Sequence, residues 1–211
     1  MEYETEEQQV EALKAWWAEN GRSVIAGVIL GVVVIGGWSF WQNRQETRAI
    51  TASDAYSEAM AAVAAGDGER VTALADELAD DFDGTLYAAY ANLAAARVAV
   101  EAGDLDAAAE RLAWTAENAP QDDVKLIAAV RLARVDGARG DVDAALARLP
   151  ETYAAEFAGL VEEARGDLLV AAGDTDGARA AYETARDSGL VADPEALGMK
   201  LDDLAVADAA S

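Results

Sequence analysis

The pattern of hydrophobic and polar positions divides the chain into three parts, of which the middle one is the most distinctive. Residues 23–43 carry no charged side chain, and the apolar run SVIAGVILGVVVIGGWSFW extends from Ser23 to Trp41. At about 1.5 Å of rise per residue, these 21 positions span roughly 30 Å, the thickness of the hydrocarbon core of a bilayer. A core helix of a soluble protein would carry polar residues along one face, and this stretch does not. We therefore predict a transmembrane helix over residues 23–43.

Bulky aromatic residues bracket this apolar stretch. Trp16 and Trp17 precede it, and Trp38, Phe40 and Trp41 lie at its end. Such amphipathic rings favour the headgroup level of a membrane. A cleavable signal peptide would have a shorter apolar core of about 7–15 residues, followed by small residues at the cleavage site. Because bulky residues stand there instead, we expect the anchor to stay attached.

Two glycines inside the anchor, Gly27 and Gly31, have the small-xxx-small spacing that lets membrane helices approach closely. They are candidate helix-packing residues. Glycine is also common in membrane helices that pack against nothing, so both interpretations stay open.

Residues 1–22 are predicted to form a short amphipathic tail. Val10, Leu13 and Trp17 recur at helical spacing, with acidic residues on the other side. Asn20-Gly21 is expected to interrupt the helix before the anchor begins. We expect the tail to lie along the membrane surface or to dock on a partner. Two basic residues flank the anchor on each side, so the positive-inside rule leaves the orientation open.

Residues 44–211 read as an all-α domain with periodic turns. Alanine is abundant, and no alternating β-branched run typical of a strand occurs there. The dipeptide Gly-Asp recurs at Gly66, Gly103, Gly140 and Gly173, with spacings of 37, 37 and 33 residues. Each glycine is suited to the left-handed C-cap of one helix, and the following aspartate to the N-cap of the next. A repeat of this length, built from helical hairpins, predicts a solenoid.

The small residues around these turns resemble those of tetratricopeptide repeats. Seven positions before each of the last three turn glycines stand Ala96, Ala133 and Gly166, and five positions after each stand Ala108, Ala145 and Ala178. These are the small residues that this motif packs between its helices. The first unit fits less well, because Val71 replaces the small residue of its second helix, and Pro150 cuts short the segment that starts at Val142. Residues 194–206 are expected to form a capping helix whose Leu197, Leu201 and Leu204 close the core.

Taken whole, the chain resembles the YfgM-like family of ancillary SecYEG translocon subunits. The resemblance rests on the tail segment QVEALK at residues 9–14, on Glu19-Asn20-Gly21, and on the anchor. The anchor carries GVILGV at residues 27–32 and ends in Gly-Trp, with a second aromatic residue two or three positions on. It covers the full length and is strongest over residues 8–63. The resemblance implies a single-pass protein of the bacterial inner membrane, with a cytoplasmic N-terminus and a periplasmic repeat domain. It also implies the SecYEG translocon, a PpiD-like membrane-anchored periplasmic chaperone and client polypeptides as partners.

Composition narrows the possible partners. The chain holds 40 acidic against 16 basic residues, for a net charge of −24, and only three of the basic residues are lysines. Nucleic acid is excluded as an expected partner, because phosphate binding rests on clustered Lys and Arg. A surface that is this acidic and poor in lysine repels itself unless salt screens it, which suggests a source that lives at high salt.

The sequence nominates no catalytic chemistry. Cysteine and histidine are both absent, which removes disulfides, thiolate nucleophiles, Cys/His zinc sites and the commonest general base. The Asp-x-Asp pairs after the turn glycines, beginning at Asp104, Asp141 and Asp174, do not continue into a complete calcium-binding loop. No phosphate-binding glycine loop or nucleophile elbow occurs. We expect no enzyme activity, cofactor, specific metal site or small-molecule substrate.

A helical-hairpin solenoid offers a concave surface, lined by the first helix of each hairpin. The lining positions of the tetratricopeptide motif fall in this chain on Tyr90, Leu93, Arg97, Ile127, Val130, Arg134, Leu160, Glu163 and Asp167. Arg97 and Arg134 stand on equivalent positions of two repeats, where they could hold a carboxylate or a peptide backbone. Ordinary ion pairing with nearby Asp or Glu is the alternative.

These features favour a non-catalytic, membrane-tethered binding protein of the Sec translocon. Its repeat domain (residues 44–211) would contact a periplasmic chaperone or emerging secreted or outer-membrane protein chains. The alternative is a membrane-anchored structural scaffold that oligomerises through Gly27 and Gly31 and organises an envelope complex.

Overall fold

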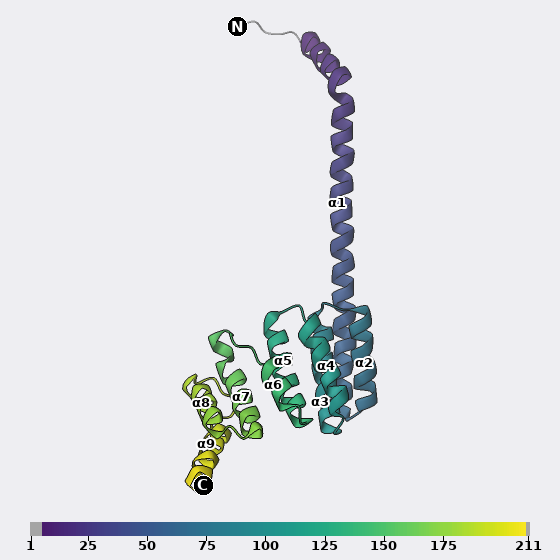
Figure 1. Ribbon diagram of the computed structural model, residues 1–211. Helices are drawn as coiled ribbons and strands as arrows, with labels where there is room; N and C mark the ends of the chain where they lie inside the picture. The colour runs from purple at the N-terminus through teal and green to yellow at the C-terminus, as the bar shows by residue number, and fades with distance from the viewer. Residues whose placement is uncertain (1–5, 210–211) are drawn as a thin grey trace. The chain divides into compact units, whose positions relative to one another are not determined.

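The computed structural model describes residues 6–209, and every regular element in that range is a helix (Figure 1). The chain forms two compact units, Met1–Ile50 and Thr51–Ser211. The helices are α1 (Glu6–Ala65), α2 (Gly68–Asp81), α3 (Leu86–Glu101), α4 (Leu105–Asn118), α5 (Asp122–Ala138), α6 (Val142–Arg148), a 3₁₀ turn (Ala155–Phe157), α7 (Ala158–Ala172), α8 (Thr175–Asp187) and α9 (Pro194–Ala209). The predicted all-α fold class is confirmed.

Helix α1 contains the predicted tail and anchor without a break. The expected interruption at Asn20-Gly21 is wrong, although Figure 1 shows the first turns of α1 inclined to its long straight part. The Asn20 side chain donates a hydrogen bond to the Trp16 carbonyl at 3.1 Å, which keeps its amide paired inside a helix. Gly21 is buried against the Trp17 ring, so the turn there is covered by an aromatic side chain. Residues 1–5 of the predicted tail lie outside the described residues.

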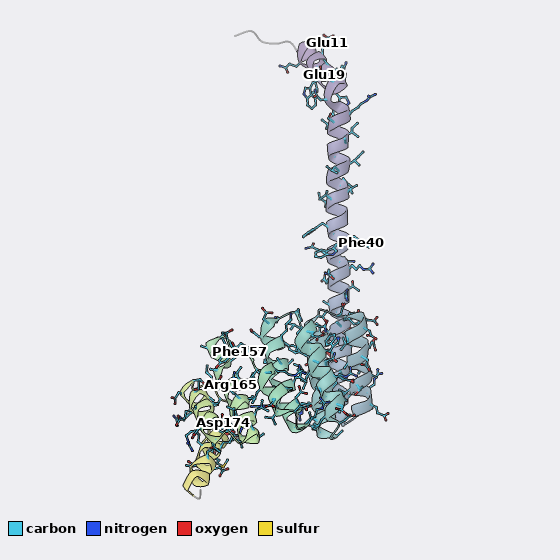
Figure 2. All side chains as sticks on the ribbon, viewed as in Figure 1. Glu11, Glu19, Phe40, Phe157, Arg165 and Asp174 are labelled. Atoms are coloured by element: carbon cyan, nitrogen blue, oxygen red, sulfur yellow. The ribbon has the colours of Figure 1, made fainter. Side chains whose placement is uncertain are left out.

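The apolar stretch of α1 is uncovered. Side chains such as Val28, Leu30 and Ile35 are each more than 60% exposed, and Figure 2 shows side chains projecting outward along this part of α1, with Phe40 labelled among them. Within the described residues, α1 is the one helix long and apolar enough to cross a membrane. An exposed apolar surface of this length requires an apolar surrounding, which a bilayer supplies. The predicted boundaries of the membrane segment, after residues 22 and 43, both fall inside the continuous helix α1. Because no helix end marks them, these boundaries remain predictions.

In residues 51–209 the helices pair into hairpins whose turns follow the predicted Gly-Asp pattern. The four turn glycines Gly66, Gly103, Gly140 and Gly173 have φ of 73°, 79°, 96° and 81°. At each turn the N–H of the following aspartate donates to a carbonyl five residues back, which is the hydrogen bond of a Schellman cap. The Asp104 carboxylate then accepts from the Ala107 N–H at 3.0 Å, and Asp67 and Asp174 cap their helices in the same way. Asp141 precedes α6 without such a bond.

Replacing Gly103 by alanine is expected to lower the free energy of unfolding by about 1 kcal/mol, because an alanine side chain strains a left-handed backbone. Gly198 offers a matched control, since it lies in α9 with nothing within 4 Å of the position of an added Cβ. Gly198→Ala should leave stability unchanged or raise it slightly. Urea unfolding of both variants measures the difference, and equal stability of the two would contradict the cap assignment.

The small residues predicted between paired helices are all buried in the described structure. Ala108, Ala145 and Ala178 have no exposed surface, and an added Cβ at Gly166 would lie 2.3 Å from the Tyr182 ring. Val71 is also fully buried, packed among alanines of α1 and α3, so the larger side chain fits the first hairpin. Helix α6 ends at Arg148, before Pro150, as expected.

Helix α9 closes the C-terminal end of the core, as the sequence predicted. Leu197 and Leu204 are buried against Ala178, Tyr182 and Ala185 of α8, and Leu201 is partly buried beside them.

Candidate partner-binding surface

The nine predicted lining residues come from α3, α5 and α7, but their surroundings differ. On α3, Tyr90 is 38% exposed and its ring lies 6.2 Å from that of Tyr56. On α5, Ile127 is partly buried, whereas Val130 is fully buried in the core beside Ala133 and Val161. Val130 therefore does not reach the surface, and this corrects the predicted set. The reason is that α4, α6 and α7 all pack against α5, and Val130 lies in the core that α5 forms with α6 and α7.

Three of the predicted residues meet in one groove. Leu93 and Arg97 of α3 and Arg134 of α5 line a cavity of about 380 Å³. The other lining residues are Ala96, Val100, Glu101, Leu112, Arg131 and Val135. We call this cavity, defined by these nine residues, the α3–α5 groove. Tyr90, Ile127, Leu160, Glu163 and Asp167 lie outside its lining.

Both predicted arginines pair with carboxylates of the chain itself, which is the alternative that the sequence left open. Arg97 Nε donates to Glu101 Oε1 at 2.8 Å, one helical turn along α3. Arg134 lies 3.6 Å from an Asp167 carboxylate oxygen, a long ion pair, and its Nε is buried without a hydrogen-bond partner. Because the Asp167 contact is longer than a hydrogen bond and the side chain is 39% exposed, the guanidinium group of Arg134 keeps unused donor capacity beside the groove.

Arg131 is not among the predicted motif positions, and the structure adds it to the groove. It lies one turn before Arg134 on α5 and lines the same groove, yet within the described residues it has no carboxylate partner. Burial, and then the neighbouring positive charge of Arg134, lower the pKa of Arg131, although the group stays charged. Its spacing of three residues from Arg134 places both on one helix face, and this spacing could have identified it.

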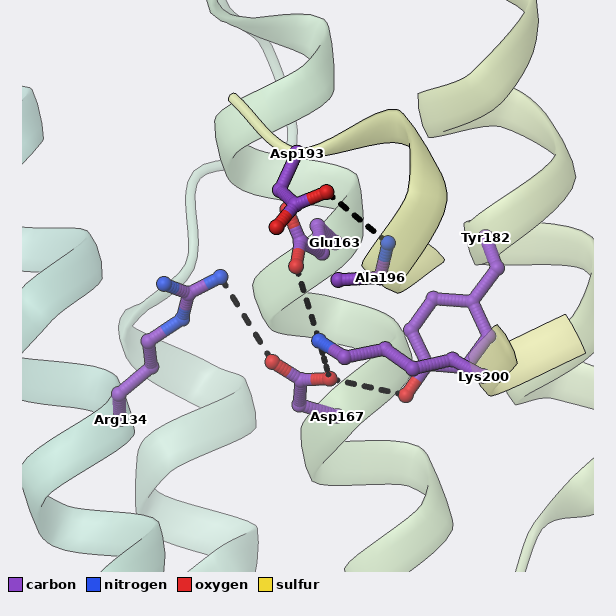
Figure 3. A network of polar contacts seen from close by, with 7 residues as sticks. All are labelled: Arg134, Glu163, Asp167, Tyr182, Asp193, Ala196 and Lys200. Carbon is purple, nitrogen blue, oxygen red and sulfur yellow. Dashed lines mark hydrogen bonds and ion pairs between the residues drawn. The ribbon is translucent and has the colours of Figure 1, made fainter. Parts of the chain in front are cut away.

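Glu163 and Asp167 are occupied by the C-terminal helix. Lys200 Nζ of α9 donates to Glu163 Oε1 at 2.8 Å and to Asp167 Oδ1 at 2.6 Å, as Figure 3 shows. Tyr182 Oη also donates to Asp167, at 2.9 Å, and the Lys200 ammonium lies 5.6 Å from the Tyr182 ring centre. Lys200 of α9 therefore occupies two of the three predicted lining positions of the last hairpin, and the third, Leu160, packs against the core. The α3–α5 groove is the more accessible region.

This network shifts two pKa values upward. Burial alone would lower the pKa of Lys200, but its hydrogen bonds with Asp167 and Glu163 raise it above the ordinary value. Burial and the hydrogen bond to Asp167 raise the pKa of Tyr182, because ionised tyrosine would lose that bond and face a carboxylate.

The folded domain is expected to lose stability as the pH rises above about 10. Tyr182 and Lys200 both bind their protons more tightly in the folded protein than in the unfolded chain. Their contribution to the free energy of unfolding is therefore complete below their unfolded pKa values, and it is lost as the pH rises through the raised folded values. Urea unfolding between pH 8 and about pH 12 measures this loss. Tyr182→Phe should make the decline shallower, and an unchanged slope would contradict the assignment.

The other buried charged groups are paired in ways that brace the fold. Asp136 accepts from Arg139 at 3.1 Å and also binds Arg148, which joins α5 to the end of α6. Glu162 accepts from Tyr153 Oη at 2.6 Å, and burial with this bond raises the pKa of Tyr153 to about 12. Among the described residues, no group of three or more potential metal ligands occurs together.

In the anchor, nothing lies within 4 Å of the position of an added Cβ at Gly27 or Gly31. Both glycines therefore face open space along α1, and their role in helix packing remains a prediction.

Comparison with known proteins agrees with this architecture. A family model described as a tetratricopeptide repeat-like domain matches residues 14–206. A protein of Escherichia coli (strain K12) named "Ancillary SecYEG translocon subunit" is 36% identical over 205 residues, which cover 97% of this chain and 98% of the relative. Proteins with the same name are 32% identical over 199 residues in Haemophilus influenzae (94% of this chain, 97% of the relative) and 30% identical over 171 residues in Neisseria gonorrhoeae (79% and 80%). No solved structure matches the chain. The family match confirms the predicted tetratricopeptide-like fold.

Proposed function

Because this chain belongs to the family of ancillary SecYEG translocon subunits with a tetratricopeptide repeat-like domain, we propose that it is an accessory subunit of the Sec translocon in the inner membrane. The observation that carries this proposal is the match over nearly the full length, which includes both the uncovered apolar part of α1 and the helical hairpins. The proposed role is one of binding, since the buried carboxylates Asp136 and Glu162 are used in ion pairs within the fold.

The proposed topology is a single membrane pass, with residues 1–22 in the cytoplasm, 23–43 in the bilayer and 44–211 in the periplasm. The apolar exposure of α1 supports the span. The orientation rests on the resemblance of the tail and anchor to the family. Gly27 and Gly31, with open space beside them, are proposed to pack against a helix of the translocon or of a membrane-anchored companion.

The repeat domain is proposed to bind a membrane-anchored periplasmic chaperone of the PpiD-like kind, emerging polypeptide chains, or both. Tethering supports this role physically, because confinement beside the exit of the translocon raises the effective concentration of the domain without any new contact. The α3–α5 groove and the partly exposed Tyr90 are the regions available for such contacts.

The proposal is tested by purifying the full-length protein from membranes solubilised in mild detergent and probing for translocon subunits. Translocon subunits should co-purify with the intact chain. A chimera in which residues 23–43 are replaced by an unrelated membrane helix of equal length serves as the control, and it should recover less. Absence of translocon subunits from the intact protein would overturn the proposal.

A further inference from the structure

We propose that the α3–α5 groove binds a polypeptide segment in which apolar side chains alternate with aspartate or glutamate side chains. This inference rests on the proposed function only in taking the ligand to be a polypeptide.

The groove has an apolar wall suited to side chains of a peptide. Leu93 and Val100 of α3, Leu112 of α4 and Val135 of α5 line it, and Val100 is 44% exposed. The cavity of about 380 Å³ is within the range of roughly 300–1,000 Å³ that ligand pockets usually occupy. Burying apolar side chains there would supply non-directional binding energy.

Guanidinium groups stand on both sides of this apolar wall. Arg97 projects from α3, while Arg131 and Arg134 project from successive turns of α5. One carboxylate, that of Glu101, lines the groove, and it is paired with Arg97. The groove is therefore locally basic in a chain whose net charge is −24. Charge complementarity selects an anionic ligand for this place.

The two arginines of α5 have guanidinium N–H donors that are not used in hydrogen bonds within the described residues. Arg131 has no carboxylate partner within the described residues, and the Arg134 side chain is 39% exposed with its Asp167 contact, at 3.6 Å, longer than a hydrogen bond. A carboxylate that binds between them would relieve the repulsion between the two guanidinium groups and form charge-assisted hydrogen bonds. Two guanidinium groups one helical turn apart match acidic side chains spaced along a segment better than a single terminal carboxylate.

The test measures fluorescence anisotropy with full-length protein in detergent micelles and a short fluorescein-labelled peptide. The peptide repeats the pattern Leu-Asp-Leu-Glu and carries an amidated C-terminus. It should bind at low salt and more weakly as salt rises. The matched peptide with Asn and Gln in place of the acids should bind at least about tenfold more weakly, because it cannot form charge-assisted bonds. A third peptide, with Asn and Gln and a free C-terminal carboxylate, tests the terminal group alone.

Arg131→Gln is expected to weaken binding of the acidic peptide by about tenfold without disturbing the fold, since no ion pair within the described residues depends on Arg131. Arg186→Gln is the matched control, because Arg186 lies exposed on α8, pairs with Asp187 and does not line the groove. Val100→Glu, which adds a carboxylate at the exposed apolar wall, should also weaken binding.

Equal affinities for the acidic and amide peptides would overturn this inference, as would binding that depends on the free C-terminus. An Arg131→Gln variant that binds as tightly as Arg186→Gln would also overturn it. These results are distinct from a failure of the proposed function, which appears as loss of translocon co-purification whatever the peptides do.

Discussion

The double substitution Ile29→Arg and Val33→Arg is expected to remove most of the protein from the membrane-integrated fraction. Both side chains lie on one face of α1, four residues apart, and are 58% and 63% exposed. Each arginine near the centre of a membrane helix costs roughly 2.5–3.5 kcal/mol on insertion scales, so the pair costs about 5–7 kcal/mol. That cost exceeds the favourable insertion free energy of several apolar residues, which is about 0.3–0.6 kcal/mol each.

Extraction of membranes at alkaline pH measures the effect, because integral proteins stay in the pellet. The double variant Ile29→Leu and Val33→Leu is the control and should remain integrated. If the arginine variant stayed in the pellet as fully as the leucine variant, α1 would not be the span.

Lys200→Met is expected to lower the free energy of unfolding by about 1–2 kcal/mol and to loosen α9. The substitution leaves Glu163 and Asp167, which are partly buried, without the ammonium that both bind. Breaking a fully buried pair costs about 3–5 kcal/mol, and the smaller figure reflects the 33% exposure of the Lys200 side chain.

Hydrogen exchange of α9 amides and urea unfolding measure this loss. Lys125→Met is a matched control, because Lys125 lies partly buried on α5 and is not among the residues that Lys200 binds. Lys200→Met combined with Glu163→Gln should recover part of the stability, since it removes one uncompensated carboxylate. Equal exchange rates in α9 for Lys200→Met and Lys125→Met would contradict a stabilising role of the Lys200 contacts with Glu163 and Asp167.

The features that the sequence predicted correctly are local or periodic. A Gly-Asp turn needs one left-handed residue and one cap, and both requirements can be read from adjacent letters. The recurrence of this turn, together with small residues at fixed offsets such as Ala133 and Ala145, was enough to predict the helical hairpins. The leucines of α9 were predicted for the same reason, since helical spacing marks their buried face.

The features that the sequence did not predict depend on tertiary contacts. Lys200 is 37 residues from Glu163, and no local pattern shows that α9 turns back over α7. The position of Val130 in the motif predicts a surface residue, but neighbouring helices bury it. At Asn20-Gly21, side-chain contacts with Trp16 and Trp17 maintain the helix against the local preference for a turn.

Site-specific photocrosslinking in native membranes tests the central claim most directly, with probes at Gly31 in the anchor and at Tyr90 on α3. Open space surrounds Gly31, and Tyr90 is 38% exposed, so both probes can reach a partner. An accessory role in the Sec translocon predicts adducts from Gly31 to a translocon subunit or a membrane-anchored chaperone, and adducts from Tyr90 to periplasmic proteins or emerging chains. Adducts only between copies of this protein would contradict that role and favour a membrane-anchored scaffold.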